Sequence, residues 1–473
     1  MTEIFTKGMQ TPDLSDRREL FVDREIIEKL AGAGLKLHHP QRAGVAFRYS
    51  LPWEGAYSGH VSIFRDGDRY RMYYRGLADA HDRNGSVTGV AESEDGKTFE
   101  RLKVGQFEVR GSAENNVVMV NGRDLYASNF APFLDERPGV PKDERYKAVT
   151  RNYGWFEKDT RDDPMGLMVF ASPDGLRWRK LREGPVLTKG AFDSLNVAFW
   201  SEHEGCYVCY FREFVGEIRS IARSRSEDFI HWEEPELMDF GDTPLEHLYT
   251  NGTKPYFRAP HLYLSIGARF WPGRQVLDAE EARRMGVDED RWNDCSDVVL
   301  MSSRGGNRFD RTFMESFIRP GRDRGNWATR CNYPAYGMVQ TGEDELSLYV
   351  DRHNAQADKH LERMTLRLDG FASLSAGYGG GEMISKPLHF DGRELEINYA
   401  TSAAGSVRVE LQDVEGRSLP GYTHADCAEI VGDEIGRVVT WKGGSDLGKF
   451  RKQPIRMRWI LKDADVFSFR FRG

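Results

Sequence analysis

The chain has 473 residues, more than the ~150 of an ordinary domain, which predicts two domains. Its 39% hydrophobic and 30% charged residues exclude a disordered chain, and its net charge of −8 argues against a nucleic-acid partner, because binding a phosphate backbone needs a basic face. No stretch approaches the ~20 apolar residues of a membrane span, so no membrane partner is expected.

The N-terminal residues MTEIFTKGMQTPDLSDRR are polar and lack a signal-peptide core. We therefore expect a cytoplasmic protein, or a secreted or periplasmic one if a leader has been removed. Five scattered cysteines do not suit a disulfide framework, and the C-x-x-C pair Cys206 and Cys209 lies in a strand-like run, CYVCYF, which sends the two side chains to opposite faces. Zinc and nucleotide-binding motifs are absent from the sequence, so we expect no cofactor and no metal site.

A polar turn followed by an aromatic residue recurs along the chain. Each copy follows an alternating apolar run, and the Asp-Gly pair found in several copies suits a tight hairpin whose aromatic residue opens the next strand. The copies are Ser93–Phe99, Ser172–Trp178, Ser226–Trp232, Ser302–Phe309 and, more weakly, Arg367–Phe371.

Another strand–turn–strand pattern precedes each of these turns. Its copies are His60–Gly76, Asn129–Asn152, Asn196–Glu213, Thr253–Phe270 and Tyr333–His353. Together the two patterns give five units of four strands, which predicts an all-β fold with a five-bladed β-propeller over residues 51–376. Two stacked β-sandwiches built from the same hairpins are the alternative.

The remaining segments differ from the repeat. GYGGGE (Gly377–Glu382) suggests a flexible join, and the longer alternating strands after it predict a C-terminal β-sandwich over residues 382–473. Residues 1–50 are expected to pack on the propeller. Helix is scarce; the best candidate is Asp278–Gly286, which has an Asp cap, a Glu three residues later and a closing glycine.

The order of a five-bladed propeller and a β-sandwich resembles glycoside hydrolase family 32 and the wider group of five-bladed glycosidases that includes family 43. The segments RELFVDREIIE, PWEGAYSGH, LERMTLRLDGFAS and DCAEIVGDE look like bacterial proteins described as family 32-like, and the resemblance covers nearly the whole chain. It implies this fold and a glycosidase activity.

The chain departs from the family at its three catalytic acids. The first-blade strand reads YSGHVS and contains no Asp, where the family has W-x-N-D-P-N-G. Asn129 stands about where the R-D-P Asp would fall, and Asn196 stands near the expected E-C Glu, with Asp193 three residues earlier. The family's acids therefore do not carry over one for one.

Glycosidic cleavage needs two carboxyl groups that flank the bond. The starts of the first strands of the five blades converge on one mouth of a propeller, and the acids there are Asp193, Glu246 and Glu54, our candidate catalytic residues. Glu213 and Asp351 lie farther along the second strands.

Polar residues at the same strand ends are our candidates for substrate binding. They are His60, Asn129, Asn196, His247, Asn251, Asn332 and His353. The second strands also end in one arginine each: Arg75, Arg151, Arg212, Arg269 and Arg352. These arginines either pair with neighbouring carboxylates as scaffolding or form a basic funnel for an anionic group.

We therefore expect a glycoside hydrolase that cleaves an oligo- or polysaccharide, an anionic one if the arginines face the mouth. One alternative is a glycoside phosphorylase of the five-bladed group, which would use the basic residues to hold phosphate. Another is a non-catalytic propeller that binds carbohydrate. The expected partner in each case is an oligosaccharide.

Overall fold

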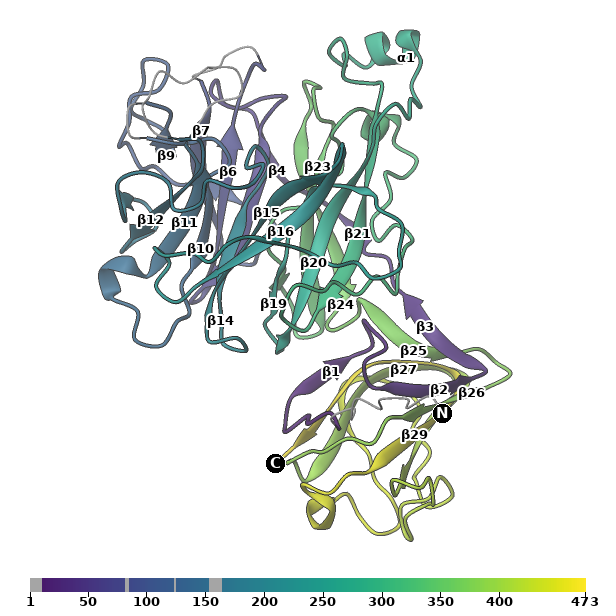
Figure 1. Cartoon of the computed structure of the whole chain (residues 1–473). Helices are drawn as coiled ribbons and strands as arrows, with labels where there is room; N and C mark the ends of the chain where they lie inside the picture. The colour runs from purple at the N-terminus through teal and green to yellow at the C-terminus, as the bar shows by residue number, and fades with distance from the viewer. Residues whose placement is uncertain (1–10, 81–84, 123–124, 153–163) are drawn as a thin grey trace, which may run out of the picture. The chain divides into compact units, whose positions relative to one another are not determined.

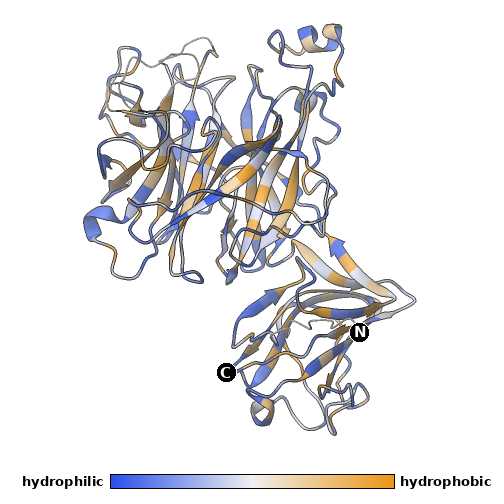
Figure 2. Ribbon diagram, viewed as in Figure 1, coloured by the Kyte–Doolittle hydropathy of each residue, from blue (hydrophilic) through white to orange (hydrophobic). Residues whose placement is uncertain are grey.

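The computed structural model describes residues 11–80, 85–122, 125–152 and 164–473, and the chain forms two compact units (Figure 1). One unit is His39–Leu366. The other combines the N-terminal residues up to His38 with Arg367–Gly473. Figure 2 shows that hydrophobic residues concentrate in the strands of both units, as expected when each strand buries one face.

The unit His39–Leu366 is a five-bladed β-propeller, as the repeats predict. Each blade is one antiparallel sheet. Blade 1 contains β5 (Gly59–Asp66), β6 (Arg69–Gly76), β7 (Val87–Ser93), β8 (Glu100–Arg101) and β9 (Val117–Val120). Blade 2 contains β10 (Ala131–Leu134), β11 (Tyr146–Arg151), β12 (Leu167–Ser172) and β13 (Arg179–Lys180). Blade 3 contains β14 (Val197–Ser201), β15 (Cys206–Val215), β16 (Ile218–Ser226) and β17 (Glu236–Leu237).

The last two blades depart slightly from this pattern. Blade 4 contains β18 (His247–Thr250), β19 (Lys254–Tyr256), β20 (Ala259–Trp271) and β21 (Cys295–Ser303), with β18 and β19 both pairing with β20. Blade 5 contains β22 (Val339–Gln340), β23 (Glu345–Arg352), β24 (His360–Arg367) and β4 (Gln41–Arg48). The innermost strands of neighbouring blades contact one another, β5 with β10 and β22, and β14 with β10 and β19, so they surround the propeller axis.

Closure of the propeller joins residues far apart in sequence. The N-terminal strand β4 pairs antiparallel with β24 and supplies the fourth strand of blade 5. Blades 5 and 1 also meet through main-chain hydrogen bonds, because Ile63 N donates to Tyr336 O at 2.8 Å and Tyr336 N donates to Val61 O at 2.7 Å. Backbone pairing of the first and last blades leaves fewer exposed strand edges.

The recurring polar turn has a common hydrogen-bond pattern. In blade 2, Gly175 N donates to Ser172 Oγ at 2.8 Å and Leu176 N donates to Asp174 Oδ1 at 2.8 Å. The corresponding turns of blades 1 and 3 repeat both bonds. Because Ser and Asp side chains satisfy the N–H groups that a tight turn leaves unpaired, this sequence unit marks the same corner in each blade.

The second unit is a curled eight-stranded sheet that packs on itself as a β-sandwich. Its long strands β27 and β29 pair along their lengths, and its core includes Trp459 and Phe469. The strands are β1 (Arg18–Leu20), β2 (Ile27–Ala31), β3 (Ala33–Leu37), β25 (Ala372–Ala376), β26 (Gly381–Ser385), β27 (Glu394–Gln412), β28 (Asp433–Val438) and β29 (Arg456–Arg472).

The unit boundaries differ from those expected at residues 50, 376 and 382. Residues 18–37 pair with sandwich strands rather than forming part of a segment 1–50 on the propeller, while 41–48 complete blade 5. Strand β25 belongs to the sandwich, and the expected join Gly377–Glu382 is a turn between β25 and β26 inside that unit. Alternation indicates that a segment is a strand, but it carries no information about a partner hundreds of residues away.

The predicted helix is present as α1 (Ala279–Arg284). Asp278 and Glu281 form the expected capping box, and Gly286 adopts φ +69° after the helix. The short 3-10 turns in the described parts of the chain are η1 (Lys142–Glu144), η2 (Arg324–Trp327) and η3 (Gly448–Phe450). Over the described ranges, the helices are all too short or too polar to cross a membrane.

Candidate active site at the propeller axis

A cavity of about 50 Å³ lies where first strands begin and second strands end, as expected for the mouth of the propeller. Residues of blades 1, 3, 4 and 5 contribute to it. Its lining consists of Tyr57, Ser58, Gly59, His60, Arg75, Asp193, Tyr249, Arg330, Tyr333, Asp351, Asn354 and Lys359. The cavity thus combines two carboxyl groups, three cationic side chains, one imidazole and three phenols.

The backbone at the start of β5 allows blade 5 to approach closely. Gly59 has φ +142°, and a Cβ atom on it would lie 2.5 Å from Asp351 Oδ2 and 3.4 Å from Lys359 Nζ. A glycine is therefore required here, both for its backbone angle and for the space it leaves. The next residue, His60, also has a positive φ of 50°, and it lines the cavity.

Asp351 is the buried carboxyl group of the cavity. It lies on β23, is 4% exposed, and accepts a hydrogen bond of 2.8 Å from the Tyr49 hydroxyl. Burial raises the pKa of the Asp351 carboxyl, although the nearby Lys359 ammonium and the Tyr49 hydrogen bond act in the opposite direction. A carboxyl group in such surroundings is suited to hold a proton and to donate it.

Asp193 is the more accessible carboxyl group. It lies in the segment before β14, its side chain is 37% exposed, and it forms an ion pair with Arg212 of β15. Arg212 itself is only 4% exposed, and burial lowers its pKa. The two carboxyl groups thus have different surroundings, one enclosed and hydrogen-bonded to a phenol, the other open and beside a guanidinium group.

Arg75 lines the cavity, and among the described residues it has no carboxylate within hydrogen-bond distance. Its Nη1 donates to Asn129 Oδ1 at 3.1 Å and its Nη2 to the Tyr57 carbonyl at 2.9 Å. Burial, followed by repulsion from Arg151, lowers the pKa of Arg75 to about 10. Burial and the charges of Arg75 and Arg151 also lower the pKa of His60 well below its usual value, so this imidazole is neutral at pH 7.

Lys359 and Arg330 are two further cations of the cavity. Lys359 is 5% exposed and donates to Asn354 Oδ1 at 2.9 Å, and burial lowers its pKa. The guanidinium carbon of Arg330 lies 5.6 Å from the centre of the Tyr249 ring, a cation–π distance. Arg212 lies 5.2 Å from the same ring, so Tyr249 lies between cations.

The five arginines of the second strands fall into different environments. Arg269 binds Asp297 through two bonds of 2.9 and 2.7 Å, and Arg352 binds Glu362 at 2.8 Å, as expected for scaffolding. Arg75 lines the cavity, while Arg212 contacts its wall through Asp193. Arg151 is 2% exposed, and its charge acts on His60 and Arg75.

Two of the three candidate catalytic acids lie outside the cavity lining. Glu54 is 2% exposed and accepts bonds of 2.8 and 2.6 Å from Arg101, together with a bond from the Tyr74 hydroxyl. Glu246 accepts bonds of 2.9 and 2.6 Å from Arg269 and Arg311. We expected these acids near the mouth because each lies close to the start of a strand. Their side chains instead bind basic partners within the blades.

The candidate asparagines support the loops rather than line the cavity. Asn129 donates to the Ser194 carbonyl at 3.0 Å, and Asn196 donates to the Phe192 carbonyl at 3.0 Å. These bonds fix the segment that carries Asp193. Similar main-chain bonds involve Asn251 with Thr253 N and Asn332 with the Ser296 carbonyl.

The candidate histidines have three different roles. His60 lines the cavity. His247 lies 3.3 Å from an Arg219 nitrogen, and burial followed by the Arg219 charge lowers its pKa. His353 lies between Asp323 and Asp358, at 2.9 and 2.8 Å, outside the cavity lining.

The cavity lining also contains Arg330, Lys359 and Asp351, which were not among the candidate site residues. Asp351 precedes Arg352 on a second strand. We preferred acids at the starts of first strands as catalytic candidates, so we did not select Asp351. Arg330 precedes the first strand of blade 5 by several residues. Lys359 follows the hairpin after β23, a place where the repeat has no recurring residue.

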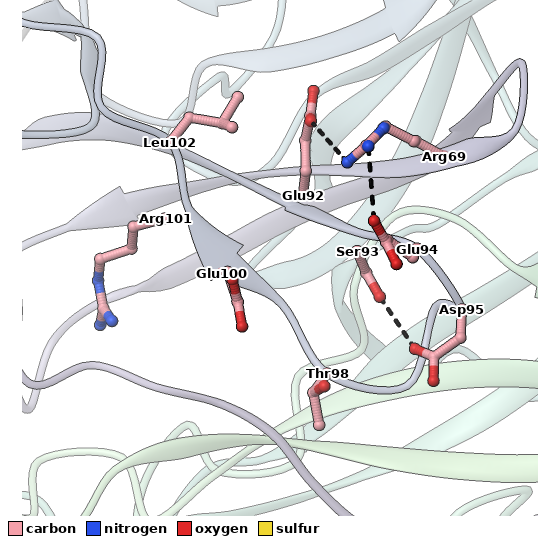
Figure 3. A pocket seen from close by; sticks show the side chains of 9 residues that line it. All are labelled: Arg69, Glu92, Ser93, Glu94, Asp95, Thr98, Glu100, Arg101 and Leu102. Carbon is pink, nitrogen blue, oxygen red and sulfur yellow. Dashed lines mark hydrogen bonds and ion pairs between the residues drawn. The ribbon is translucent and has the colours of Figure 1, made fainter.

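A larger cavity of about 440 Å³ lies on the outer strands of blade 1. Figure 3 shows its polar side chains pairing with one another: Arg69 approaches Glu92 and Glu94 at 4.0 and 3.5 Å, and Ser93 donates to Asp95 at 3.1 Å. It shares no lining residue with the axial cavity. In the described part of the chain, the acidic, histidine and cysteine side chains form no group of three that could hold a metal ion.

Comparison with known proteins gave structural matches only. No family model matches the chain, and no curated protein sequence matches it. A GH32 beta-fructofuranosidase of Bombyx mori is 12% identical over 90% of this chain and 94% of its own, with a TM-score of 0.45. A glycosyl hydrolase from Bacteroides ovatus is 16% identical over 74% and 93%, with a TM-score of 0.38. An N-acetylgalactosamine deacetylase from F. plautii, in complex with blood group B trisaccharide, is 11% identical over 70% and 96%, with a TM-score of 0.46.

The described strands themselves establish the architecture. Five sheets around one axis and a separate curled sheet make this a five-bladed β-propeller with a β-sandwich, the fold implied by the resemblance to family 32 and family 43 enzymes. A fold of this kind supports several activities, so the function has to be argued from the residues of the axial cavity.

Proposed function

We propose that the protein is a carbohydrate-active enzyme, a glycoside hydrolase that cleaves an oligo- or polysaccharide at the axial cavity. The observation that carries this proposal is the presence of two carboxyl groups, Asp193 and Asp351, in one cavity but in different surroundings. Pairs of carboxyl groups whose environments separate their protonation are the usual means of cleaving a glycosidic bond.

Asp351 is assigned the role of general acid. Burial raises the pKa of its carboxyl, which favours the protonated form that such a step needs. In the reaction, this proton passes to the glycosidic oxygen as the bond between that oxygen and the anomeric carbon breaks. The leaving sugar departs as an alcohol, and Asp351 is left as a carboxylate.

Asp193 is assigned the role of nucleophile or general base. Its carboxylate either attacks the anomeric carbon, giving a covalent intermediate that water then hydrolyses, or removes a proton from the water that attacks directly. Its 37% exposed side chain leaves room for substrate or water to approach, and the Arg212 guanidinium beside it supports the negative charge. Tyr57, Tyr249 and Tyr333 add phenol rings and hydroxyl groups suited to sugar faces and sugar hydroxyls.

The test is a hydrolysis screen over neutral and acidic oligosaccharides, with the wild-type protein and two variants. Asp193→Asn and Asp351→Asn should each lower turnover by about 10²–10⁴-fold, the usual loss for a general acid or base. Asp143→Asn, which removes an exposed carboxylate paired with Arg179 on blade 2, is the matched control and should keep wild-type turnover. Wild-type rates in both cavity variants would exclude this pair.

Phosphorolysis is the second candidate, favoured by the cations Arg75, Arg330 and Lys359 in the same cavity. A phosphorylase would use inorganic phosphate in place of water and release a sugar phosphate. Running the screen with and without phosphate separates the two reactions. Saccharide binding without any product would instead support a non-catalytic binding propeller.

A further inference from the structure

Among the described residues that line the axial cavity, cations outnumber carboxylates. The carboxylates are Asp193 and Asp351, and the cations are Arg75, Arg330 and Lys359, with the buried Arg212 beside Asp193. Like charges repel strongly where water is scarce, and buried charge without a partner costs free energy. Burial, and after it the charge of Arg151, lowers the pKa of Arg75.

Several polar atoms of the cavity lining, and of Arg212 beside Asp193, lack hydrogen-bond partners within the described residues. They are Arg75 Nε, Arg212 Nε, Arg212 Nη1 and the Tyr333 hydroxyl. Arg212 is 4% exposed. Buried donors are normally paired, so a group of unpaired donors beside a cavity indicates that a ligand with acceptor oxygens completes them.

The size of the cavity limits what it can hold. Its volume is about 50 Å³. Because one water-sized group needs ~10–15 Å³ on this measure, there is room for roughly three to five non-hydrogen atoms. That is the size of a carboxylate, sulfate or phosphate group and smaller than a sugar ring.

We propose that the axial cavity binds an anionic substituent of the substrate, and that the protein acts on an acidic saccharide. This inference rests on the proposed hydrolase function and specifies its substrate class. The shared chemistry is a compact oxyanion held by Arg75, Arg330 and Lys359, and the glycosidic bond next to it lies at the carboxyl groups of Asp193 and Asp351.

The anion is assigned to the saccharide rather than to free phosphate because of Asp193. An inverting phosphorolytic reaction needs only one carboxyl group of the protein, as proton donor, since phosphate itself attacks the anomeric carbon. A second carboxylate in the cavity supplies the role that phosphate would otherwise take.

Binding of small probes tests the anion site without relying on turnover. The probes are glucuronate, galacturonate, sulfate and phosphate, with glucose and galactose as neutral counterparts, each titrated calorimetrically. We expect the wild-type protein to bind at least one anionic probe and to bind the matching neutral sugar far more weakly. Arg330→Gln should weaken anion binding about tenfold or more, the usual value of a charge-assisted hydrogen bond.

Two further variants keep this experiment decisive. Lys359→Met removes a second cavity cation and should weaken the same probe, so the test survives if one variant fails to fold. Arg177→Gln removes an exposed guanidinium, 79% accessible, at the turn after β12, and should bind as the wild type does. Absence of anion binding, or equal affinity in the cavity variants and Arg177→Gln, would overturn the inference.

A turnover arm separates this inference from the proposed function. Uronate-terminated oligosaccharides are compared with the same chains after carboxyl reduction, with and without phosphate. Faster cleavage of the acidic chain supports both proposals. Equal cleavage of both chains refutes the anion site and leaves the hydrolase standing. Selective anion binding without cleavage of any chain refutes the hydrolase instead, and strictly phosphate-dependent release of a sugar phosphate assigns the anion to the co-substrate and overturns the inference.

Discussion

The β-sandwich and the propeller axis both bury charged side chains, but they balance them differently. In the sandwich, Arg18 pairs with Glu396 at 2.8 Å and Asp369 at 3.4 Å. Glu396 also accepts bonds of 2.9 and 2.8 Å from Arg470 and Arg472. At the propeller axis, by contrast, cations exceed carboxylates and several donors lack partners within the described residues.

This difference distinguishes charges that are paired within the fold from charges that we propose to pair with a ligand. A buried charge is tolerated in a scaffold when a partner of opposite sign and its hydrogen bonds compensate for lost hydration. The same contrast exists within the propeller, where Arg269 and Arg352 have carboxylate partners and Arg75 has an amide and a carbonyl. Strong pairing thus indicates a structural arginine, whereas the weaker pairing of Arg75 is one of the observations behind the proposed anion site.

The largest stability effect is expected in the sandwich. Arg18→Met removes a buried cation and leaves Asp369, which is fully buried, without that partner. Breaking a buried pair in this way should lower the free energy of unfolding by about 3–5 kcal/mol. Urea unfolding measures it, and kcat/KM of the folded variant should be unchanged. A loss below about 1 kcal/mol would mean that the ion pairs of Arg18 contribute no more to stability than exposed surface pairs do.

Glu54→Gln tests whether a paired charge inside the propeller is structural rather than catalytic. Glu54 holds Arg101 and the Tyr74 hydroxyl, so a neutral amide should lower the free energy of unfolding by about 2 kcal/mol, the value of hydrogen bonds to a charged group. Denaturation and turnover are measured on the same preparation. Full stability together with lost turnover would return Glu54 to the catalytic residues.

The pH dependence of stability is expected to have opposite signs at two carboxyl groups. The pKa of Asp351 is raised, first by burial, so its folded form holds a proton that the unfolded chain releases. Its contribution to stability is therefore full at acidic pH and falls as pH rises through the folded pKa, by at most about 1.4 kcal/mol per pH unit. Relative to Asp351→Asn, the wild type should lose stability as pH increases above the ordinary Asp range.

Asp174 provides the matched control for that titration. Burial opposes the shift, but hydrogen bonds from the Arg177 and Leu176 N–H groups lower the pKa of Asp174. Its contribution is present above the unfolded pKa and is lost on acidification, so the difference between wild type and Asp174→Asn should have the opposite slope. Equal slopes for both variants would contradict the assignment.

The smallest effect concerns the repeated turn. Ser172→Ala removes the acceptor for Gly175 N, which lies 2.8 Å from the hydroxyl, and should lower the free energy of unfolding by about 1 kcal/mol. Turnover should not change, because the turn is not part of the cavity lining. Thermal unfolding measures the loss, and a drop in kcat with full stability would contradict a purely structural role.

Local sequence was sufficient for features that neighbouring residues complete by themselves. The capping box of Asp278 and Glu281 forms over one helical turn, and the Ser–Asp turns repeat their bonds in successive blades. The number of blades followed from the same repetition. The partner of β4 did not, because pairing with β24 joins residues more than three hundred positions apart.

The candidate site shows the same limit at the level of single side chains. Strand ends were correctly expected to meet at one mouth, and Asp193, His60 and Arg75 line the cavity there. Glu54 and Glu246 occupy comparable chain positions, yet their carboxylates turn toward Arg101 and Arg311. Which acid faces the axis depends on the nearest basic group in space, and linear position does not specify it.

The sequence by itself determined the repeating units, their turns and the all-β class, because alternation, capping and turn chemistry act over a few residues. Only the tertiary structure decided which charged side chains are paired within the fold. Asp351 meets Lys359 and Gly59 at the cavity because β5, β23 and the start of β24 converge at one end of the axis. Charge compensation depends on distances between separate strands, and those distances exist only once the blades have closed into a ring.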